Sequence, residues 1–324
     1  MLKKAKMAIS AVLLTSIFYM DSTIILAKSN DNLSQSEMKK LKEVFKFSDQ
    51  HIEDLVEDGF VQDYLSMEKP VVSKKEEYYE LTREPNGEVA VEQLTKKEFD
   101  TKVTENQESN EQKEKDGESG LISTLGHDIE DRHDYITLET WFIYDEVDWD
   151  AQASARFEFA DNSSTYGFTE ADLYDDILAI GVSENARLMP GTEDFSLKYR
   201  LYGFNGEYDK YGDPINEWYS DSKTDSKADL RDEGGYAFNV NFPSLNNNRR
   251  QHIKNIRGYM KVDVEPEGSS WGGERYDVFS HYLHTQYKIH WSGAFSIPIG
   301  GSIAFEYEDD VQKITGHTSE RIRD

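Results

Sequence analysis

The sequence predicts a mainly β protein with a small helical N-terminal part and an antiparallel β-sandwich or barrel-like body. From Leu121 onward, short segments alternate apolar and polar residues, as strands with one buried face do. Clusters of Asn, Asp and Gly separate these segments, which is typical of the turns in sandwiches and barrels. Before Leu121, apolar residues recur every three or four positions in one stretch, which indicates helix.

Residues 1–27 have the pattern of a secretory signal peptide. The positively charged "MLKKAKM" precedes the apolar "AISAVLLTSIFYM", which is short for a membrane span. Cleavage is expected after Ala27, although Ile25 at the −3 position is bulkier than usual. An uncleaved anchor is the alternative. We therefore expect a secreted, extracellular protein without a membrane span in its mature form.

Two short modules are expected after the signal peptide. In residues 28–68, apolar stripes with helical spacing run from Met38 to Phe45 and from Ile52 to Val56, and Ser48 between them is a suitable N-cap. This predicts a helical hairpin. In residues 69–103, the turn signal "PNG" separates two alternating segments, which predicts a β-hairpin.

Residues 104–120, "TENQESNEQKEKDGESG", contain no apolar residue. Such a segment has nothing to bury that offsets the entropy of ordering, so we predict a disordered acidic linker and a domain boundary. The sandwich domain is then expected at 121–316 and a short tail at 317–324. Within the sandwich, "ILAIGV" is apolar throughout, which predicts a strand buried on both faces.

The composition excludes several classes of function. The formal net charge is −27, with 63 Asp and Glu against 36 Lys and Arg, so the chain as a whole repels nucleic acid. There is no cysteine, which excludes disulfides, Cys-ligated zinc and thiol catalysis. No nucleophile elbow, phosphate-binding loop or dinucleotide fingerprint occurs in a suitable context.

Several stretches resemble a group of uncharacterised secreted proteins of Bacillus-type bacteria. "LKEVFKFSDQHIEDLVEDGF" followed by "VSKKEEYYEL" is similar to the front end of these proteins. "DDILAIGVSENA", "GGYAFNVNFP", "NIRGYMKV" and "WSGAFSIPIGGSIAF" are similar in order to their C-terminal β-domain. The resemblance implies export and a β-rich C-terminal domain. It implies no activity and no site residues.

The acidic stretch "YDEVDWDA", Tyr144–Ala151, is the main candidate for chemistry. It lies between two alternating segments, so we interpret it as a polar hairpin turn. A calcium site is the next hypothesis, because carboxylate oxygens are ligands that calcium prefers, although the spacing matches no EF-hand loop. Its ligands would be Asp145, Asp148 and Asp150, joined by Asp172 and Asp176 from "EADLYDD". A carboxylate pair for glycoside hydrolysis is the third hypothesis.

Two tryptophans in polar contexts, Trp218 in "INEWYSD" and Trp271 in "SSWGGERY", are candidates for ligand binding. A flat aromatic ring covers the C–H face of a sugar, although a tryptophan in a loop is also a common packing anchor. His281, His284 and His290 are interpreted as packed or surface residues, with a metal site as the alternative.

These observations predict a secreted, non-enzymatic binding or surface-interaction protein whose partner is an extracellular or cell-surface ligand. No cofactor is expected, calcium being the one candidate. The alternative functions are an extracellular glycan hydrolase that uses a carboxylate pair and, third, a pore-forming β-protein.

Overall fold

The computed structural model describes residues 33–83, 89–115, 132–160, 176–208, 210–211, 214–232, 234–240, 252–268, 271–285, 295–296, 304–305 and 311–322. The predicted signal peptide and its cleavage site after Ala27 lie outside these ranges. The chain divides into two compact units, Met1–Pro70 and Val71–Asp324. Within the described ranges, no helix is both long enough and apolar enough to cross a membrane.

The first unit contains three described helices, α3 (Gln35–Glu43), α4 (Asp49–Asp58) and α5 (Val61–Ser66). Ser48 caps α4 as predicted, because its side chain accepts a hydrogen bond of 3.1 Å from the His51 N–H. The helix ends at Gly59, whose φ of 80° suits glycine. The predicted helical hairpin at 28–68 is therefore extended by α5, which begins directly after this turn.

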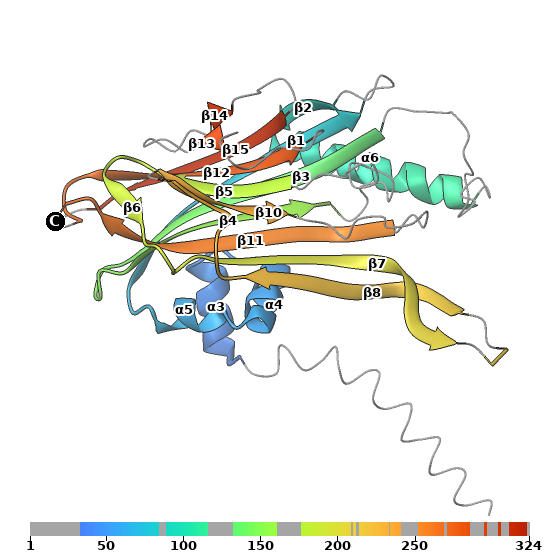
Figure 1. The fold of residues 1–324 in the computed structure, drawn as a ribbon, viewed down its shortest axis with the longest axis horizontal. Helices are drawn as coiled ribbons and strands as arrows, with labels where there is room; N and C mark the ends of the chain where they lie inside the picture. Colours follow the sequence, from blue (N-terminus) through green and yellow to red (C-terminus); the bar gives the residue numbers. More distant parts are fainter. Residues whose placement is uncertain are drawn as a thin grey trace, which may run out of the picture. The chain divides into compact units, whose positions relative to one another are not determined.

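The second unit contains two large sheets of mostly antiparallel strands (Figure 1). Sheet A has the order β2-β1-β3-β4-β11-β7-β8, and β6 pairs with β11. Its strands are β1 (Pro70–Arg83), β2 (Val89–Leu94), β3 (Arg132–Asp145), β4 (Ala151–Phe159), β6 (Ala186–Leu188), β7 (Asp194–Tyr208), β8 (Pro214–Asp225) and β11 (His252–Pro266).

Sheet B has the order β15-β12-β5-β10-β9. Its strands are β5 (Asp176–Val182), β9 (Leu230–Asp232), β10 (Gly235–Val240), β12 (Arg275–Thr285) and β15 (Val311–Arg321). A separate pair is formed by β13 (Phe295–Ser296) and β14 (Ala304–Phe305). All seven residues of β5 are buried, which confirms the strand with two buried faces predicted from "ILAIGV".

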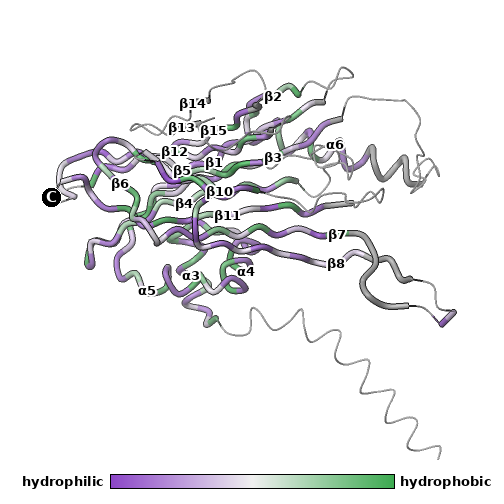
Figure 2. Tube along the Cα trace, in the orientation of Figure 1, coloured by the Kyte–Doolittle hydropathy of each residue, from purple (hydrophilic) through white to green (hydrophobic). Residues whose placement is uncertain are grey.

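The two sheets pack face to face around one apolar core, so the predicted fold class is confirmed in its sandwich form. Figure 2 shows hydrophobic and hydrophilic residues alternating along the strands. Aromatic rings join the sheets: Phe157 of β4 lies 4.5 Å from Tyr282 of β12, and Phe195 of β7 stacks on Phe238 of β10 at 5.1 Å. Side chains from the inner faces of both sheets therefore meet in one core.

The structure corrects the predicted boundary at 104–120. Strands β1 and β2, predicted as a separate hairpin at 69–103, belong to sheet A, and the chain divides at Pro70 instead. Residues 104–115 lie in helix α6 (Lys96–Lys115), so the prediction of disorder is wrong for them, while 116–120 lie outside the described ranges. The predicted tail is also corrected, because β15 extends to Arg321 and pairs with β12 along its length.

Helix α6 forms because its first turn is well nucleated. Thr95 and Glu98 make a capping box. The Glu98 N–H donates a hydrogen bond of 3.3 Å to the Thr95 hydroxyl, and the Thr95 N–H donates one of 2.9 Å to the Glu98 carboxylate. Phe99 and Val103 pack with Leu94 against sheet A. The remaining Glu, Gln and Lys residues are good helix formers, and propagation from an existing turn needs no apolar residue.

A polar cluster lies between β1, β3, β12 and β15 inside the sandwich. The hydroxyl groups of Thr140 and Ser280 are 2.5 Å apart and join the two sheets. Gly316 faces them, and a Cβ atom there would lie only 2.4 Å from the Thr140 hydroxyl and 2.8 Å from the Glu77 Oε2 atom. Only glycine therefore allows this close approach of the sheets.

Glu77 is the one carboxylate in this cluster. Burial raises the pKa of its carboxyl group above the ordinary value, although Lys75 and the His317 backbone N–H act in the opposite direction. Its Oε2 atom has no hydrogen-bond partner among the described residues. Ionising Glu77 in the folded state is therefore unfavourable.

We predict that Glu77→Gln raises the melting temperature near pH 8. The raised pKa means that the folded state loses stability as the pH rises through that pKa. Below about pH 4, where the carboxyl group is protonated in both states, the difference from the wild type should vanish. The measurement is thermal unfolding by circular dichroism from pH 3 to pH 9.

Glu76→Gln, one residue away on β1, is the matched control with the opposite expected sign. Burial raises the pKa of Glu76, but hydrogen bonds and charge from Lys74 and Tyr78 outweigh it and hold the pKa below its ordinary value. This substitution should therefore lower the melting temperature at pH 8 and have less effect at pH 4. Equal destabilisation by Glu77→Gln at both pH values would contradict the interpretation.

Candidate functional site

The acidic stretch Tyr144–Ala151 is a hairpin turn, as predicted, because β3 and β4 pair up to Tyr144 and Ala151. The Asp145 N–H donates a hydrogen bond of 2.8 Å to the Asp150 carbonyl oxygen, which closes the turn. Asp145 is only 1% exposed, and its carboxylate accepts a hydrogen bond of 2.8 Å from the Val147 N–H. Asp145 is therefore a structural residue that holds the backbone of its own turn.

Trp149 occupies an unusual position in this turn. Its φ is 66°, in the left-handed region that a bulky residue rarely adopts. That conformation costs about 1–2 kcal/mol for an L-residue, so the surrounding structure must enforce it. Two backbone hydrogen bonds do so. The Trp149 N–H donates to the Asp145 carbonyl at 3.0 Å, and the Trp149 carbonyl accepts from the Trp271 indole N–H at 2.9 Å.

Trp271 is itself held by aromatic residues at one end of the core. Its ring lies 4.8 Å from Tyr276, 5.7 Å from Tyr144 and 6.1 Å from Phe142, and the Tyr276 hydroxyl donates to its carbonyl oxygen at 3.0 Å. Burial raises the pKa of Tyr144 and of Tyr276, so their hydroxyl groups remain neutral donors. The hydrogen bond to Trp149 thus comes from a rigidly packed ring.

The predicted ligand-binding role of Trp271 is corrected by its burial. The residue is only 4% exposed, so its ring is enclosed and has no face to offer a ligand. It is a packing anchor that positions Trp149, and sequence reasoning missed Trp149 itself. The signal was present, since Trp149 stands between Asp148 and Asp150, where a large apolar side chain is uncommon unless it is packed or used.

The outer surface of the turn combines apolar and acidic groups. Trp149 is 52% exposed and Val147 is 39% exposed, and both are among the few large apolar side chains that the described ranges present to solvent. Glu146, Asp148 and Asp150 are also exposed. An indole ring covers an apolar surface such as the C–H face of a sugar, and carboxylates accept hydrogen bonds from hydroxyl groups.

The structure does not bring Asp176 to this turn. Its carboxylate contacts the Nδ1 atom of His284 at 3.0 Å and accepts a hydrogen bond from Tyr282, and all three side chains are buried. The turn instead contacts Trp271, whose ring packs on Tyr276 at the other end of β12. Eight residues of strand separate Tyr276 from His284, which corresponds to roughly 25 Å. Asp172 lies outside the described ranges.

Trp218 lies in strand β8, not in a loop as its context suggested. It is half-buried, and the Lys254 ammonium lies 4.2 Å from the centroid of its ring. Of the three predicted histidines, His281 and His284 are buried in β12, as expected for packed residues, and His290 lies outside the described ranges. Among the described residues, no three His, Asp or Glu side chains are grouped so that they could hold a metal ion.

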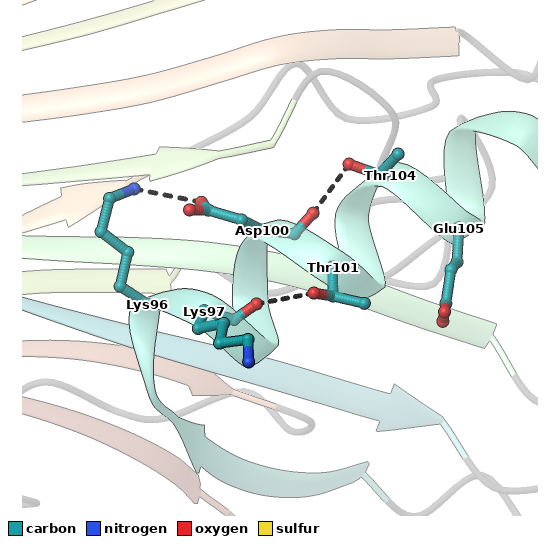
Figure 3. A pocket seen from close by; sticks show the side chains of 6 residues that line it. All are labelled: Lys96, Lys97, Asp100, Thr101, Thr104 and Glu105. Atoms are coloured by element: carbon teal, nitrogen blue, oxygen red, sulfur yellow. Dashed lines mark hydrogen bonds and ion pairs between the residues drawn. The ribbon is translucent and has the colours of Figure 1, made fainter.

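An open depression runs along α6, and Figure 3 shows the six side chains that line it. Their hydrogen bonds stay within the helix: Lys96 reaches Asp100 at 3.1 Å, and Thr101 and Thr104 each bond the carbonyl four residues earlier. The lining residues therefore stabilise their own helix, and nothing about them converges on a ligand.

We predict that calcium and sodium stabilise the fold equally when they are compared at matched ionic strength. Calcium needs six to eight oxygen ligands, whereas Asp145 is committed to its turn and Asp176 is distant. A calcium site would add about 2.7 kcal/mol at a hundredfold excess over its Kd. The measurement is the melting temperature in each salt, and a calcium-specific rise that Asp148→Ala abolishes would show that the turn binds calcium.

Comparisons with known proteins leave the family open. No family model matches the chain, and no curated protein matches it. Among solved structures, the chain is similar to the membrane-inserted form of the Clostridium perfringens NetB toxin, at 7% identity and a TM-score of 0.23 over 58% of this chain and 91% of the toxin. It is also similar to Clostridium perfringens delta-toxin, at 7% identity and a TM-score of 0.22 over 60% and 91%. Likeness at this level carries no argument about function.

Proposed function

We propose that the chain is a secreted, non-enzymatic binding protein that uses Trp149 to stack on a sugar ring of an extracellular or cell-surface glycan. The observation that supports this proposal is the combination of exposure and strain at Trp149. A strained conformation persists only when other contacts hold it, and such positions gather at functional sites. Here the strained backbone belongs to Trp149, whose exposed side chain contributes little to the core.

The construction of the turn also supports a binding role. A ligand that meets a pre-ordered aromatic ring spends little free energy on ordering it, so affinity is gained without a large pocket. Trp149 is fixed on one side by the Asp145 carbonyl and on the other by Trp271. Tyr144 also packs edge-on against its ring at 6.0 Å.

The charge around Trp149 favours a neutral sugar. Glu146, Asp148 and Asp150 would repel a carboxylate or sulfate, whereas they accept hydrogen bonds from sugar hydroxyl groups. The hydrolase and the pore-forming protein remain hypotheses from the sequence. A hydrolase would release new reducing ends from the glycan that it binds, whereas a binding protein would not, so the two functions can be told apart by measurement.

We predict that the protein is retained on at least one of the neutral polysaccharides chitin, mannan and β-glucan, and that Trp149→Ala weakens this binding tenfold or more. A stacked ring contributes roughly 1–2 kcal/mol, which corresponds to about a tenfold change in Kd. Affinity electrophoresis in gels containing each soluble polysaccharide, with pull-down on insoluble chitin, measures the effect.

Two further variants make the test specific. Tyr211→Ala removes an aromatic ring that is 77% exposed elsewhere, and it should leave binding unchanged. Trp149→Gly removes the ring but suits the left-handed backbone, so it should lose binding without a lower melting temperature. The proposal fails if none of the three polysaccharides binds, or if Trp149→Ala and Tyr211→Ala have equal effects.

A further inference from the structure

Helix α6 packs against sheet A at β1, β2 and β3, and few apolar contacts hold it there (Figure 1). Phe99 and Val103 are the only apolar residues in the helix. Both pack with Leu94 of β2 and Tyr135 of β3 in a small cluster that is separate from the main core. Most helices in proteins depend on the packing of an apolar face, so α6 needs further contacts to stay in place.

The strands beneath α6 bring two carboxylates together. In the pairing of β1 with β2, Glu80 lies directly opposite Glu92. Directly paired residues of antiparallel strands point to the same face, and like charges in such a pair are destabilising. Glu80 is only 4% exposed, so solvent screens its charge less than it screens a surface charge. The end of β2 is therefore weakened unless a cation lies beside the pair.

Lys102 of α6 provides this cation. Its ammonium group forms an ion pair with Glu80 and lies 3.6 Å from a carboxylate oxygen of Glu92. The hydrogen bond to Glu80 raises the pKa of Lys102, so the ammonium group stays charged at neutral pH. One side chain of the helix thus contacts an acid on each of the two strands.

Glu80 also has partners that do not come from the helix. The Tyr135 hydroxyl donates a hydrogen bond of 3.2 Å to its carboxylate, and the His133 Nδ1 atom lies 2.7 Å from it. Burial raises the pKa of Tyr135, so its hydroxyl group remains a donor. Both residues belong to β3, so they stay beside Glu80 if α6 moves away. Among the described residues, Glu92 has no ion-pair partner other than Lys102.

The chain connects the helix directly to this end of β2. Leu94 is the last residue of the strand, and Thr95 caps α6 immediately after it. Movement of the helix is therefore transmitted to β2. The other end of the strand is anchored, because Val89 is buried in the main core. An opening that begins in α6 can thus extend to residues 92–94 without disturbing the sandwich.

We propose that α6 is a strap that closes the edge of sheet A, and that the ion pairs of Lys102 hold it closed. In the open form, residues 92–103 leave the sheet as one unit and the rest of the sandwich stays folded. Without Lys102, Glu80 lies opposite Glu92 with no cation between them, so release of the helix favours release of the strand end. Proteins open locally in such units where few apolar contacts hold a segment. Opening uncovers the backbone edge of β1 at residues 78–80, which the closed form keeps paired.

The test is hydrogen–deuterium exchange of the full chain, measured by mass spectrometry. Lys102→Gln removes the cation, and we expect the amides of residues 92–103 to exchange threefold faster or more. Peptides from β4 and β11 should exchange as in the wild type, because the main core is not part of the opening unit. Unchanged exchange at residues 92–103, or equally faster exchange in β4 and β11, would overturn the proposal.

Two further variants test the electrostatic coupling. Glu92→Gln, added to Lys102→Gln, removes the like-charge pair, so it should restore slow exchange at residues 92–94 while residues 96–103 still exchange fast. Lys97→Gln removes an exposed cation of the same helix that makes no ion pair among the described residues, and it should exchange as the wild type does. The proposal also fails if the added Glu92→Gln changes nothing at residues 92–94, or if Lys97→Gln has the effect of Lys102→Gln. Exchange does not depend on glycan binding, so this test is separate from that of the Trp149 turn.

Discussion

The hydrogen bond from the Trp271 indole N–H to the Trp149 carbonyl oxygen is the interaction on which the account of this protein depends. It joins two residues that are 122 positions apart in the chain. Without it, the left-handed backbone at Trp149 would have support only from within its own turn, and a strained turn with one support relaxes readily. Trp271 is packed against Tyr276 and Tyr144, so this bond fixes the position of the exposed Trp149.

The sandwich provides the rigid frame that this bond requires. Trp271 precedes β12 of sheet B, whereas Trp149 lies in a turn of sheet A, so the bond has its observed length only if the two sheets keep their spacing. The Thr140–Ser280 contact beside Gly316 fixes that spacing through a close polar approach, and the Phe157–Tyr282 contact fixes it through apolar packing.

The sequence predicted the features that depend on interactions between residues close together in the chain. Alternating residues identified the strands, Ser48 identified a helix start, and the acids of Tyr144–Ala151 identified a turn. Helix α6 was missed because the absence of apolar residues was taken as evidence of disorder, whereas a capped first turn suffices to propagate a helix. The partnership of Trp271 with Trp149 and that of Lys102 with Glu80 depend on strand order and on packing between separate elements, which no spacing along one segment reveals.

The most direct test of the central claim is the backbone order parameter of Trp149 from ¹⁵N relaxation, with the indole N–H of the same residue as a second probe. The account predicts a value of about 0.85, as in the flanking strands, and a clear decrease when Trp271→Phe removes the hydrogen-bond donor but keeps an aromatic ring. A value below about 0.6 in the wild-type protein would show a mobile turn and would contradict the account. So would a wild-type value that Trp271→Phe leaves unchanged.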